Sequence, residues 1–184
     1  MRFYMNLQKS ISFIFIVPFI IIFNGCDNSI EPLEKGTCEV NVSGYVVKSY
    51  HGQAIFENVP SLGGRKIFFM HLKDNNLSND EYRYVEFSGS QPDIGTYELI
   101  NIENNNSNEG KFIGIYNDSG SYGSYKSIGG RIGITYVRDN EIKGWFDFPA
   151  YENVPINNGE SRRVEIKISG EFYATEGHTG IIVD

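Results

Sequence analysis

The chain has 184 residues, with 16 lysine or arginine and 23 aspartate or glutamate side chains, so its formal net charge is −7. An acidic chain without a basic stripe is not expected to bind nucleic acid or to adhere electrostatically to anionic lipid, because both need clustered positive charge. The length is ample for one domain that folds around a single hydrophobic core.

Residues 1–25 have the layout of a bacterial lipoprotein signal peptide. Arg2 and Lys9 come first, and residues 11–23 (ISFIFIVPFIIIF) are almost continuously apolar. This apolar run is shorter than the about 18 residues that a membrane-spanning helix needs. Asn24 and Gly25 follow the run, and a small residue directly before Cys26 resembles a lipobox, so we expect Cys26 to carry the lipid. Ordinary signal cleavage and an uncleaved anchor are the alternatives.

The mature protein would begin at Cys26 and carry 14 basic and 23 acidic residues, a formal charge of −9. Residues 26–36 are polar and read as a tether, and residues 37–184 read as a single β domain. Attachment to the membrane would come from acyl chains, of which stable anchoring needs more than one.

Cys38 alternates with Val40 and Val42, which predicts a small buried hydrophobic side chain on the first strand. A Cys26–Cys38 disulfide is the main alternative, and it requires Cys26 to remain unmodified.

Period-two alternation of apolar residues dominates the domain, and no convincing amphipathic helix appears. Early strands are expected in residues 38–46, 66–72, 83–87, 95–102 and 111–116. The clearest apolar rows come later: Ile132, Ile134 and Tyr136; Ile142, Gly144, Phe146 and Phe148; and Val164, Ile166, Ile168, Gly170, Phe172 and Ala174. The pattern predicts an all-β fold, an antiparallel β-sandwich of about 8–10 strands, with a small closed β-barrel as the alternative.

The turn around residues 138–140 tests whether these rows are mutually consistent. A two-residue loop would set an apolar row against a polar one, so a three-residue loop is predicted, with positive φ at Asn140. The expected pairs are Tyr136–Ile142, Ile134–Gly144 and Ile132–Phe146.

Two segments share a pattern, IFENVPSLGGRK from Ile55 and AYENVPINNGESRR from Ala150. Valine before proline favours extended backbone, and proline ends a strand or lies at an edge. We interpret both as connections at strand exits, and a duplicated functional loop remains the alternative.

The runs IGTYEL, GGRIGITYVRDNEIKGWFDFPA and VEIKISGEF resemble a group of uncharacterised, lipid-anchored domains common in Bacteroidota. The resemblance covers about residues 94–174. It implies an all-β extracytoplasmic lipoprotein of unknown activity at the outer membrane, and it supports lipidation of Cys26. It supplies no catalytic residues.

No catalytic motif and no metal-ligand spacing is present, so neither enzyme activity nor a cofactor is expected. The three histidines are far apart, and His71 reads as a histidine satisfied within an apolar strand. Residues 73–80 (KDNNLSND) have some calcium-loop character, but Asn79 and Val85 occupy positions that need glycine and glutamate. A solvated loop is the preferred interpretation.

Aromatic side chains are the best candidates for a binding site. Trp145 and Tyr173 alternate with charged residues on the side opposite the apolar rows, and Tyr122 and Tyr125 lie in a Gly/Ser-rich loop. Such rings beside carboxylates can stack on sugars, although a padded, two-sided sheet would use them as well.

We therefore expect a non-enzymatic, lipid-anchored β-domain that binds a partner or supports the envelope at the outer membrane, on its periplasmic face or at the cell surface. Its partners would be the membrane, through the anchor, and a glycan or envelope protein. A surface glycan-binding protein is the alternative, and a polysaccharide-acting hydrolase is a further one.

Overall fold

The computed structural model describes residues 32–60, 66–78, 80–102, 112–156 and 159–178. The predicted signal peptide and Cys26 lie outside these residues. Lipidation of Cys26 and the Cys26–Cys38 disulfide are therefore not addressed by the structure.

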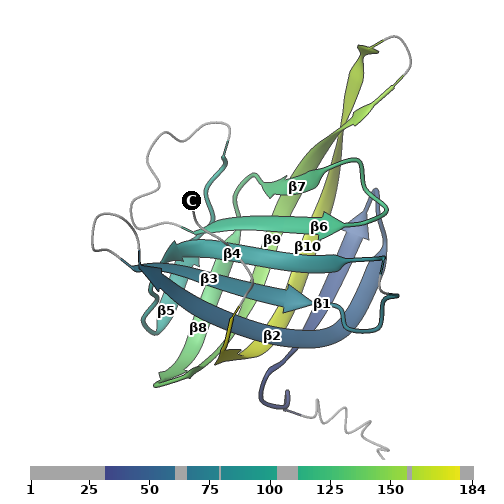
Figure 1. The fold of residues 1–184 in the computed structure, drawn as a ribbon. Coiled ribbons are helices and arrows are strands. Elements are labelled where there is room, and N and C mark those ends of the chain that lie inside the picture. The colour runs from purple at the N-terminus through teal and green to yellow at the C-terminus, as the bar shows by residue number, and fades with distance from the viewer. Residues whose placement is uncertain (1–31, 61–65, 79, 103–111, 157–158, 179–184) are drawn as a thin grey trace, which may run out of the picture. The chain divides into compact units, whose positions relative to one another are not determined.

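The described residues are almost entirely β-structure, so the all-β prediction is confirmed (Figure 1). The strands are β1 (Thr37–Gly44), β2 (Lys48–Pro60), β3 (Lys66–Lys73), β4 (Arg83–Ser90), β5 (Gly95–Glu98), β6 (Ile113–Asp118), β7 (Ser124–Ser127), β8 (Arg131–Arg138), β9 (Glu141–Pro155) and β10 (Ser161–Glu176). In these same ranges, no helix has the length and apolar character needed to cross a membrane.

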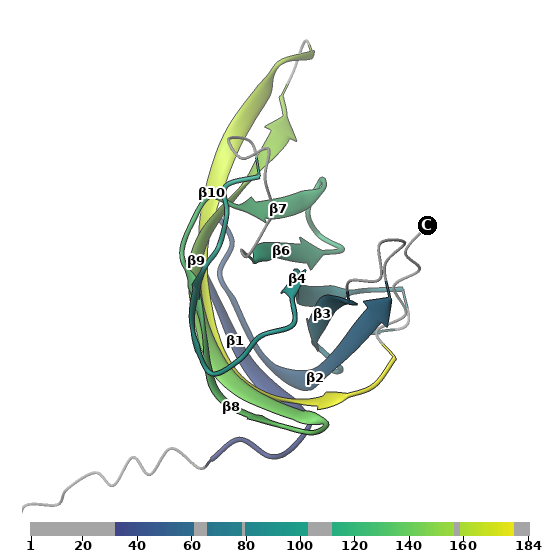
Figure 2. The same ribbon diagram turned by 90° about the vertical axis from the view of Figure 1, so that its left-hand side faces the viewer.

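All ten strands belong to one sheet that curls in a ring (Figure 2). Neighbours around the ring are β10, β1, β2, β3, β4, β6, β7 and β9, and β9 pairs again with β10. β8 and then β5 extend the sheet from the first half of β9. The pairings are antiparallel except for a two-residue parallel contact between β10 and β2.

The interior of the ring is the hydrophobic core, filled by the inward row of each strand. The row predicted from Val164 to Ala174 lies on β10, and its large side chains are all buried. On β9, Phe146 and Phe148 lie 5.3 and 5.6 Å from the ring of Phe87 on β4. Each fully buried side chain of this kind contributes about 1.5–3 kcal/mol to folding.

Cys38 is fully buried in this core, as predicted from its alternation with Val40 and Val42. Its Sγ lies 3.5 Å from the carbonyl oxygen of Gln53. Burial raises the pKa of the Cys38 thiol to about 12, so the side chain behaves as a small hydrophobe.

The end of the predicted tether is hydrogen-bonded to the domain. The Gly36 amide donates to the carbonyl oxygen of Tyr173 at 2.7 Å, and the Gly36 carbonyl accepts from the Ala54 amide at 2.8 Å. Lys35 also forms an ion pair with Glu141. Residues 35 and 36 therefore pack as part of the domain.

The predicted three-residue loop at 138–140 is wrong. Arg138 pairs with Glu141, which leaves a two-residue turn of Asp139 and Asn140. Positive φ falls on Asp139, at 39°, and not on Asn140. Aspartate tolerates this left-handed conformation because its short polar side chain bonds locally.

A bulge, and not a longer loop, keeps the apolar rows of β8 and β9 in register. The predicted pairs Ile132–Phe146 and Ile134–Gly144 are confirmed. The register shifts between Ile134 and Tyr136, so Tyr136 pairs with Lys143 and the predicted Tyr136–Ile142 pair is wrong. One extra residue in β8 moves Val137 into the inward position opposite Ile142.

The prolines of the two similar segments end strands, because β2 stops at Pro60 and β9 at Pro155, but the residues before them belong to the strands, so the interpretation as connections is wrong. The side chains of the two segments face opposite ways. Phe56 is buried and Glu57 only half-buried in β2, whereas Glu152 is buried on the inward row of β9. The same five-residue pattern therefore presents different side chains to the core, which argues against a duplicated site.

Candidate functional site

The four predicted aromatic residues fall into two separate groups. Trp145 on β9 and Tyr173 on β10 lie on the outer face of the sheet, where Trp145 is 37% exposed. Tyr122 and Tyr125 lie at the β6–β7 connection and on β7, and both line a cavity. The predicted set is therefore not one site.

In the outer-face group, the ring and the hydroxyl of Tyr173 already have partners within the chain. The Lys143 Nζ lies 3.8 Å from the centroid of the Tyr173 ring, and the Tyr173 hydroxyl donates to Glu141 at 2.5 Å. This hydrogen bond raises the pKa of Tyr173 to about 12, while hydrogen bonds from Lys35 and Tyr173 lower the pKa of Glu141. One face of the Tyr173 ring is therefore occupied by an ammonium group.

Trp145 covers the neighbouring strand in the same patch. A Cβ placed on Gly133 of β8 would come within 2.4 Å of the indole Nε1. The glycine allows the indole to lie against the backbone of β8, as aromatic residues do when they cover glycine in a sheet. One indole face is thus used for sheet packing.

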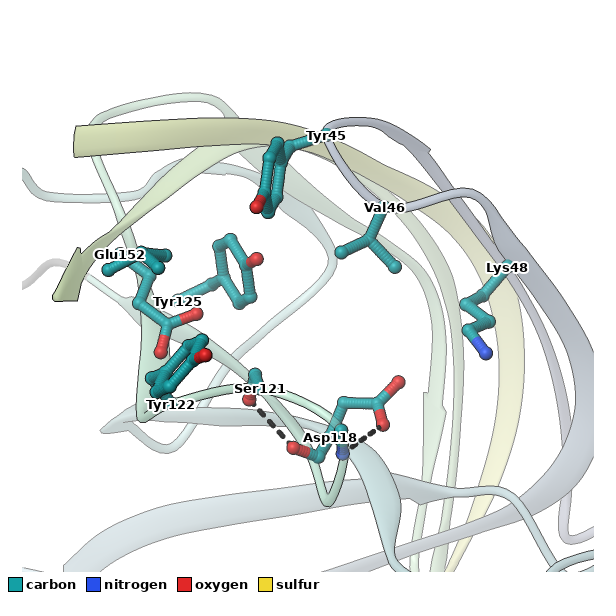
Figure 3. Close-up of a pocket in the computed structure, with 10 residues that line it drawn as sticks. Tyr45, Val46, Lys48, Asp118, Ser121, Tyr122, Tyr125 and Glu152 are labelled. Atoms are coloured by element: carbon teal, nitrogen blue, oxygen red, sulfur yellow. Dashed lines mark hydrogen bonds between the residues drawn. The ribbon is translucent and has the colours of Figure 1, made fainter. Parts of the chain in front are cut away.

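A cavity of about 210 Å³ lies where the β1–β2 turn, the β6–β7 hairpin and the end of β9 meet (Figure 3). Tyr45 and Tyr122 are 54% and 74% exposed, whereas Tyr125 is buried. The lining residues are Tyr45, Val46, Lys48, Asp118, Gly120, Ser121, Tyr122, Tyr125, Glu152 and Val154.

Glu152 is the most unusual residue in this cavity. It continues the inward row of β9 beyond Phe148 and Ala150, so alternation directs its side chain to the interior. The residue is only 5% exposed, and neither carboxylate oxygen has a hydrogen-bond partner among the described residues. Figure 3 shows the carboxylate directed into the cavity. Burying such a group without a donor costs free energy.

Two neighbours of Glu152 define the space around its carboxylate. A Cβ on Gly123 would lie 3.3 Å from Oε1, so any larger residue at position 123 would crowd this oxygen. Burial first, then the Glu152 charge, and then a weak hydrogen-bond contact with Glu152, raise the pKa of Tyr125 to about 12. The Tyr125 hydroxyl is therefore close enough to interact electrostatically with the carboxylate, but the two groups do not meet the strict geometry of a hydrogen bond.

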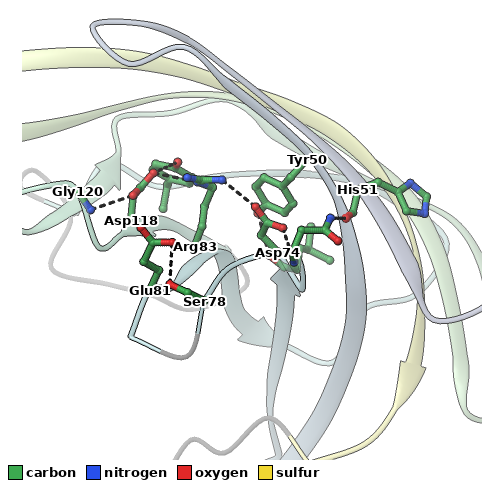
Figure 4. A network of polar contacts seen from close by, with 11 residues as sticks. Tyr50, His51, Asp74, Ser78, Glu81, Arg83, Asp118 and Gly120 are labelled. Carbon is green, nitrogen blue, oxygen red and sulfur yellow. Dashed lines mark hydrogen bonds and ion pairs between the residues drawn. The ribbon is translucent and has the colours of Figure 1, made fainter.

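Asp118 lines the same cavity but is fully engaged by its surroundings (Figure 4). Its Oδ2 accepts from Arg83 Nε at 3.0 Å and from the Tyr116 hydroxyl at 2.8 Å, and its Oδ1 accepts from the Gly120 amide at 2.9 Å. Burial alone would raise the pKa of Asp118, but hydrogen bonds from Gly120, Arg83 and Tyr116 outweigh it and lower the pKa.

Arg83 joins Asp118 to Asp74, which belongs to the segment with calcium-loop character. Arg83 Nη1 lies 2.7 Å from Asp74 Oδ2, and Asp74 Oδ1 accepts from the Asn76 amide at 3.0 Å. Asp74 is buried, so the interpretation of this segment as a solvated loop is wrong for Asp74. Its carboxylate serves the ion pair that joins the end of β3 to the start of β4.

The histidines contribute pairwise contacts, and none of them lines the cavity. His71 Nε2 lies 3.2 Å from Glu86 Oε2 across β3 and β4, which fits the prediction of a satisfied histidine. Within the ranges that the structure covers, no three His, Cys, Asp or Glu side chains are placed to hold a metal ion.

The cavity residues Glu152, Asp118 and Tyr45 were not singled out from the sequence. The alternation of β9 carried a signal for Glu152, because two further steps from Phe148 reach it. Asp118 and Tyr45 gave no local signal. No family model matches this chain, and no curated protein and no solved structure matches it either.

Proposed function

We propose that this chain is a non-enzymatic, lipid-anchored extracytoplasmic binding protein whose ligand occupies the tyrosine-lined cavity. The observation that carries the proposal is the buried Glu152 carboxylate, which faces the cavity without a donor among the described residues. Ligand sites typically combine apolar and aromatic walls with a few polar groups that fix orientation. Exposed Tyr45 and Tyr122 at the cavity and buried Glu152 have that arrangement.

The anchor and the location are part of the same proposal. The basic start, the apolar run and the small residue before Cys26 support lipidation, and the resemblance to lipid-anchored domains supports the outer membrane. Incorporation of radiolabelled palmitate into the chain, abolished by Cys26→Ala and retained in Cys38→Ala, is the expected result. Equal labelling of the Cys26→Ala variant would contradict the anchor.

Binding is tested on the purified full chain with a panel of small amines, monosaccharides and carboxylates, followed by amide NMR shifts. A ligand in the cavity shifts the amides of Gly120 and Gly123, and it leaves Gly133 beneath Trp145 unchanged. Tyr45→Ala and Tyr122→Ala, which remove exposed walls, weaken the response. Tyr82→Ala is the matched control, because Tyr82 is 49% exposed and does not line the cavity. A panel without any member that shifts Gly120 or Gly123 would contradict the proposed binding function.

A hydrolase is the second candidate, because two carboxylates, Glu152 and Asp118, line one cavity. Paired carboxylates are the machinery of most glycoside hydrolases. Asp118, however, already accepts hydrogen bonds from Arg83, Tyr116 and Gly120, which favours a structural role for it. Release of nitrophenol from nitrophenyl glycosides, lost in both Glu152→Gln and Asp118→Asn, would establish the hydrolase instead.

A further inference from the structure

We infer that the cavity at Glu152 binds a small organic cation, an alkylammonium or guanidinium group, whose N–H groups donate hydrogen bonds to the buried carboxylate. The inference rests on the proposed binding function and names the chemistry of its ligand. The cavity volume of about 210 Å³ lies below the roughly 300 Å³ at which pockets for drug-sized ligands begin, so the occupant is a small group.

The charge of the site selects for a cation. Both Glu152 oxygens can accept, and neither has a donor from the described residues. A positively charged donor suits this position better than a neutral one, because charge-assisted hydrogen bonds are about twice as strong as neutral ones. Asp118 contributes a second carboxylate to the lining.

Three cationic side chains of the protein lie near the cavity without pairing with Glu152. Arg83 is held between Asp74 and Asp118. Lys48 lies on the wall away from Glu152 in Figure 3, and the Arg162 guanidinium lies 5.6 Å from the centroid of the Tyr45 ring. None of these three cations forms an ion pair with Glu152, which leaves the carboxylate open to a ligand.

The aromatic walls suit the same ligand. Tyr45, Tyr122 and Tyr125 all line the cavity, and the first two are exposed. A cation over an aromatic face is attracted to the negative potential of the ring, and the attraction grows when the pair is desolvated. A carboxylate combined with several rings therefore favours an organic cation over a neutral molecule of equal size.

The surroundings of the cavity allow the cation to be carried on a larger molecule. Tyr45 and Tyr122 line the cavity and are exposed, so a cation bound at Glu152 can remain attached to a molecule that lies outside the cavity. A lysine side chain of a peptide and an amino sugar of a glycan share this chemistry, and the experiment distinguishes them.

The test titrates the purified full chain with n-butylammonium and with its neutral counterpart n-butanol, followed by amide NMR shifts. We expect saturable shifts of Gly120 and Gly123 with n-butylammonium and none with n-butanol at equal concentration. Glu152→Gln, which keeps the shape and removes the charge, weakens binding by about 30-fold or more, as loss of a buried charge partner does. Glu165→Gln on the exposed face of β10 is the control and leaves binding unchanged.

Two further arms identify the source of the cation and guard against a folding defect. Tighter binding of Nα-acetyl-lysine amide than of glucosamine indicates a peptide, and the reverse order indicates a glycan. Glu152→Asp retains the charge and binds n-butylammonium more tightly than Glu152→Gln, although both variants fold.

Equal binding of n-butanol and n-butylammonium, or unchanged binding by Glu152→Gln, would overturn the inference. In either case the proposed binding function would stand, because the cavity would still respond. No response to any probe in the panel would remove both proposals together.

Discussion

Asp118 and Glu152 line the same cavity, yet the fold treats their carboxylates in opposite ways. Asp118 accepts hydrogen bonds from Arg83, Tyr116 and Gly120, and its pKa is lowered. Glu152 is equally buried, but neither of its carboxylate oxygens accepts a hydrogen bond of good geometry from the described residues. A completed buried network stabilises a fold, whereas an incomplete one costs stability and persists where a ligand completes it.

Removal of the Arg83 side chain is expected to change the stability of the fold the most. Arg83→Met leaves Asp74 and Asp118 buried without their cation, which should lower the free energy of unfolding by about 3–5 kcal/mol. Urea unfolding of the variant measures the loss. Lys167→Met is the control, because its ion pair with Asp147 is exposed on the outer face and contributes about 0–1 kcal/mol. Equal losses of stability in the two variants would show that the buried Arg83 network stabilises the fold no more than an exposed ion pair does.

Replacement of Glu152 is expected to act in the opposite direction. Glu152→Leu extends the apolar row of β9 and removes an unpartnered buried carboxylate, so the free energy of unfolding should rise by about 1–3 kcal/mol. Glu165→Leu on the exposed face should stay within about 0.5 kcal/mol of the parent. A marked loss of stability in Glu152→Leu would mean that Glu152 makes a favourable contact within the chain, and the proposed site would lose its basis.

A smaller effect on stability is expected on acidification, when Asp118 becomes protonated. Its folded pKa lies below the ordinary value of 3.8, so its contribution to stability is complete above that pH. The contribution is lost as the pH falls from 3.8 through the lowered folded pKa. Unfolding midpoints in urea should therefore fall more steeply below pH 4 in the parent than in Asp118→Asn, whose stability is already reduced. Parallel curves for the two proteins would contradict the role given to this carboxylate.

The smallest effect is expected at Trp145, on the outer face. Trp145 and Glu152 are seven residues apart on β9, about 23 Å by strand rise, so substitutions at the two positions should act independently. Trp145→Ala should change the dissociation constant for n-butylammonium by less than about twofold. A large loss of binding would show that the ligand contacts the outer face at Trp145. A glycan array probed with the parent and with Trp145→Ala tests glycan binding on that face directly.

The apolar rows of β9 and β10 could be predicted from the sequence because a sheet with one dry face repeats every second residue. The same alternation indicates Glu152, since the row from Ile142 to Phe148 continues through Ala150. The prediction missed it because the ENVP segment was interpreted as a connection that follows the strand, whereas β9 runs to Pro155. A glutamate on an apolar row is a signal that sequence alone can supply.

Other features depend on contacts that no local pattern encodes. Tyr122 and Tyr125 share a Gly/Ser-rich segment, but only Tyr125 is buried, because β7 pairs with β6 and β9 there. Asp118 and Arg83 are 35 positions apart and meet only when β4 pairs with β6. The bulge in β8 was likewise hidden, because it and a longer loop both preserve the same apolar register.

A crystal structure of the full chain grown with n-butylammonium would show directly whether a cation occupies the cavity at Glu152. We expect the ammonium nitrogen within about 3 Å of a Glu152 carboxylate oxygen, with the alkyl chain between the rings of Tyr45 and Tyr122. A structure in which Glu152 instead accepts hydrogen bonds from its own chain, with no ammonium in the cavity, would contradict this expectation.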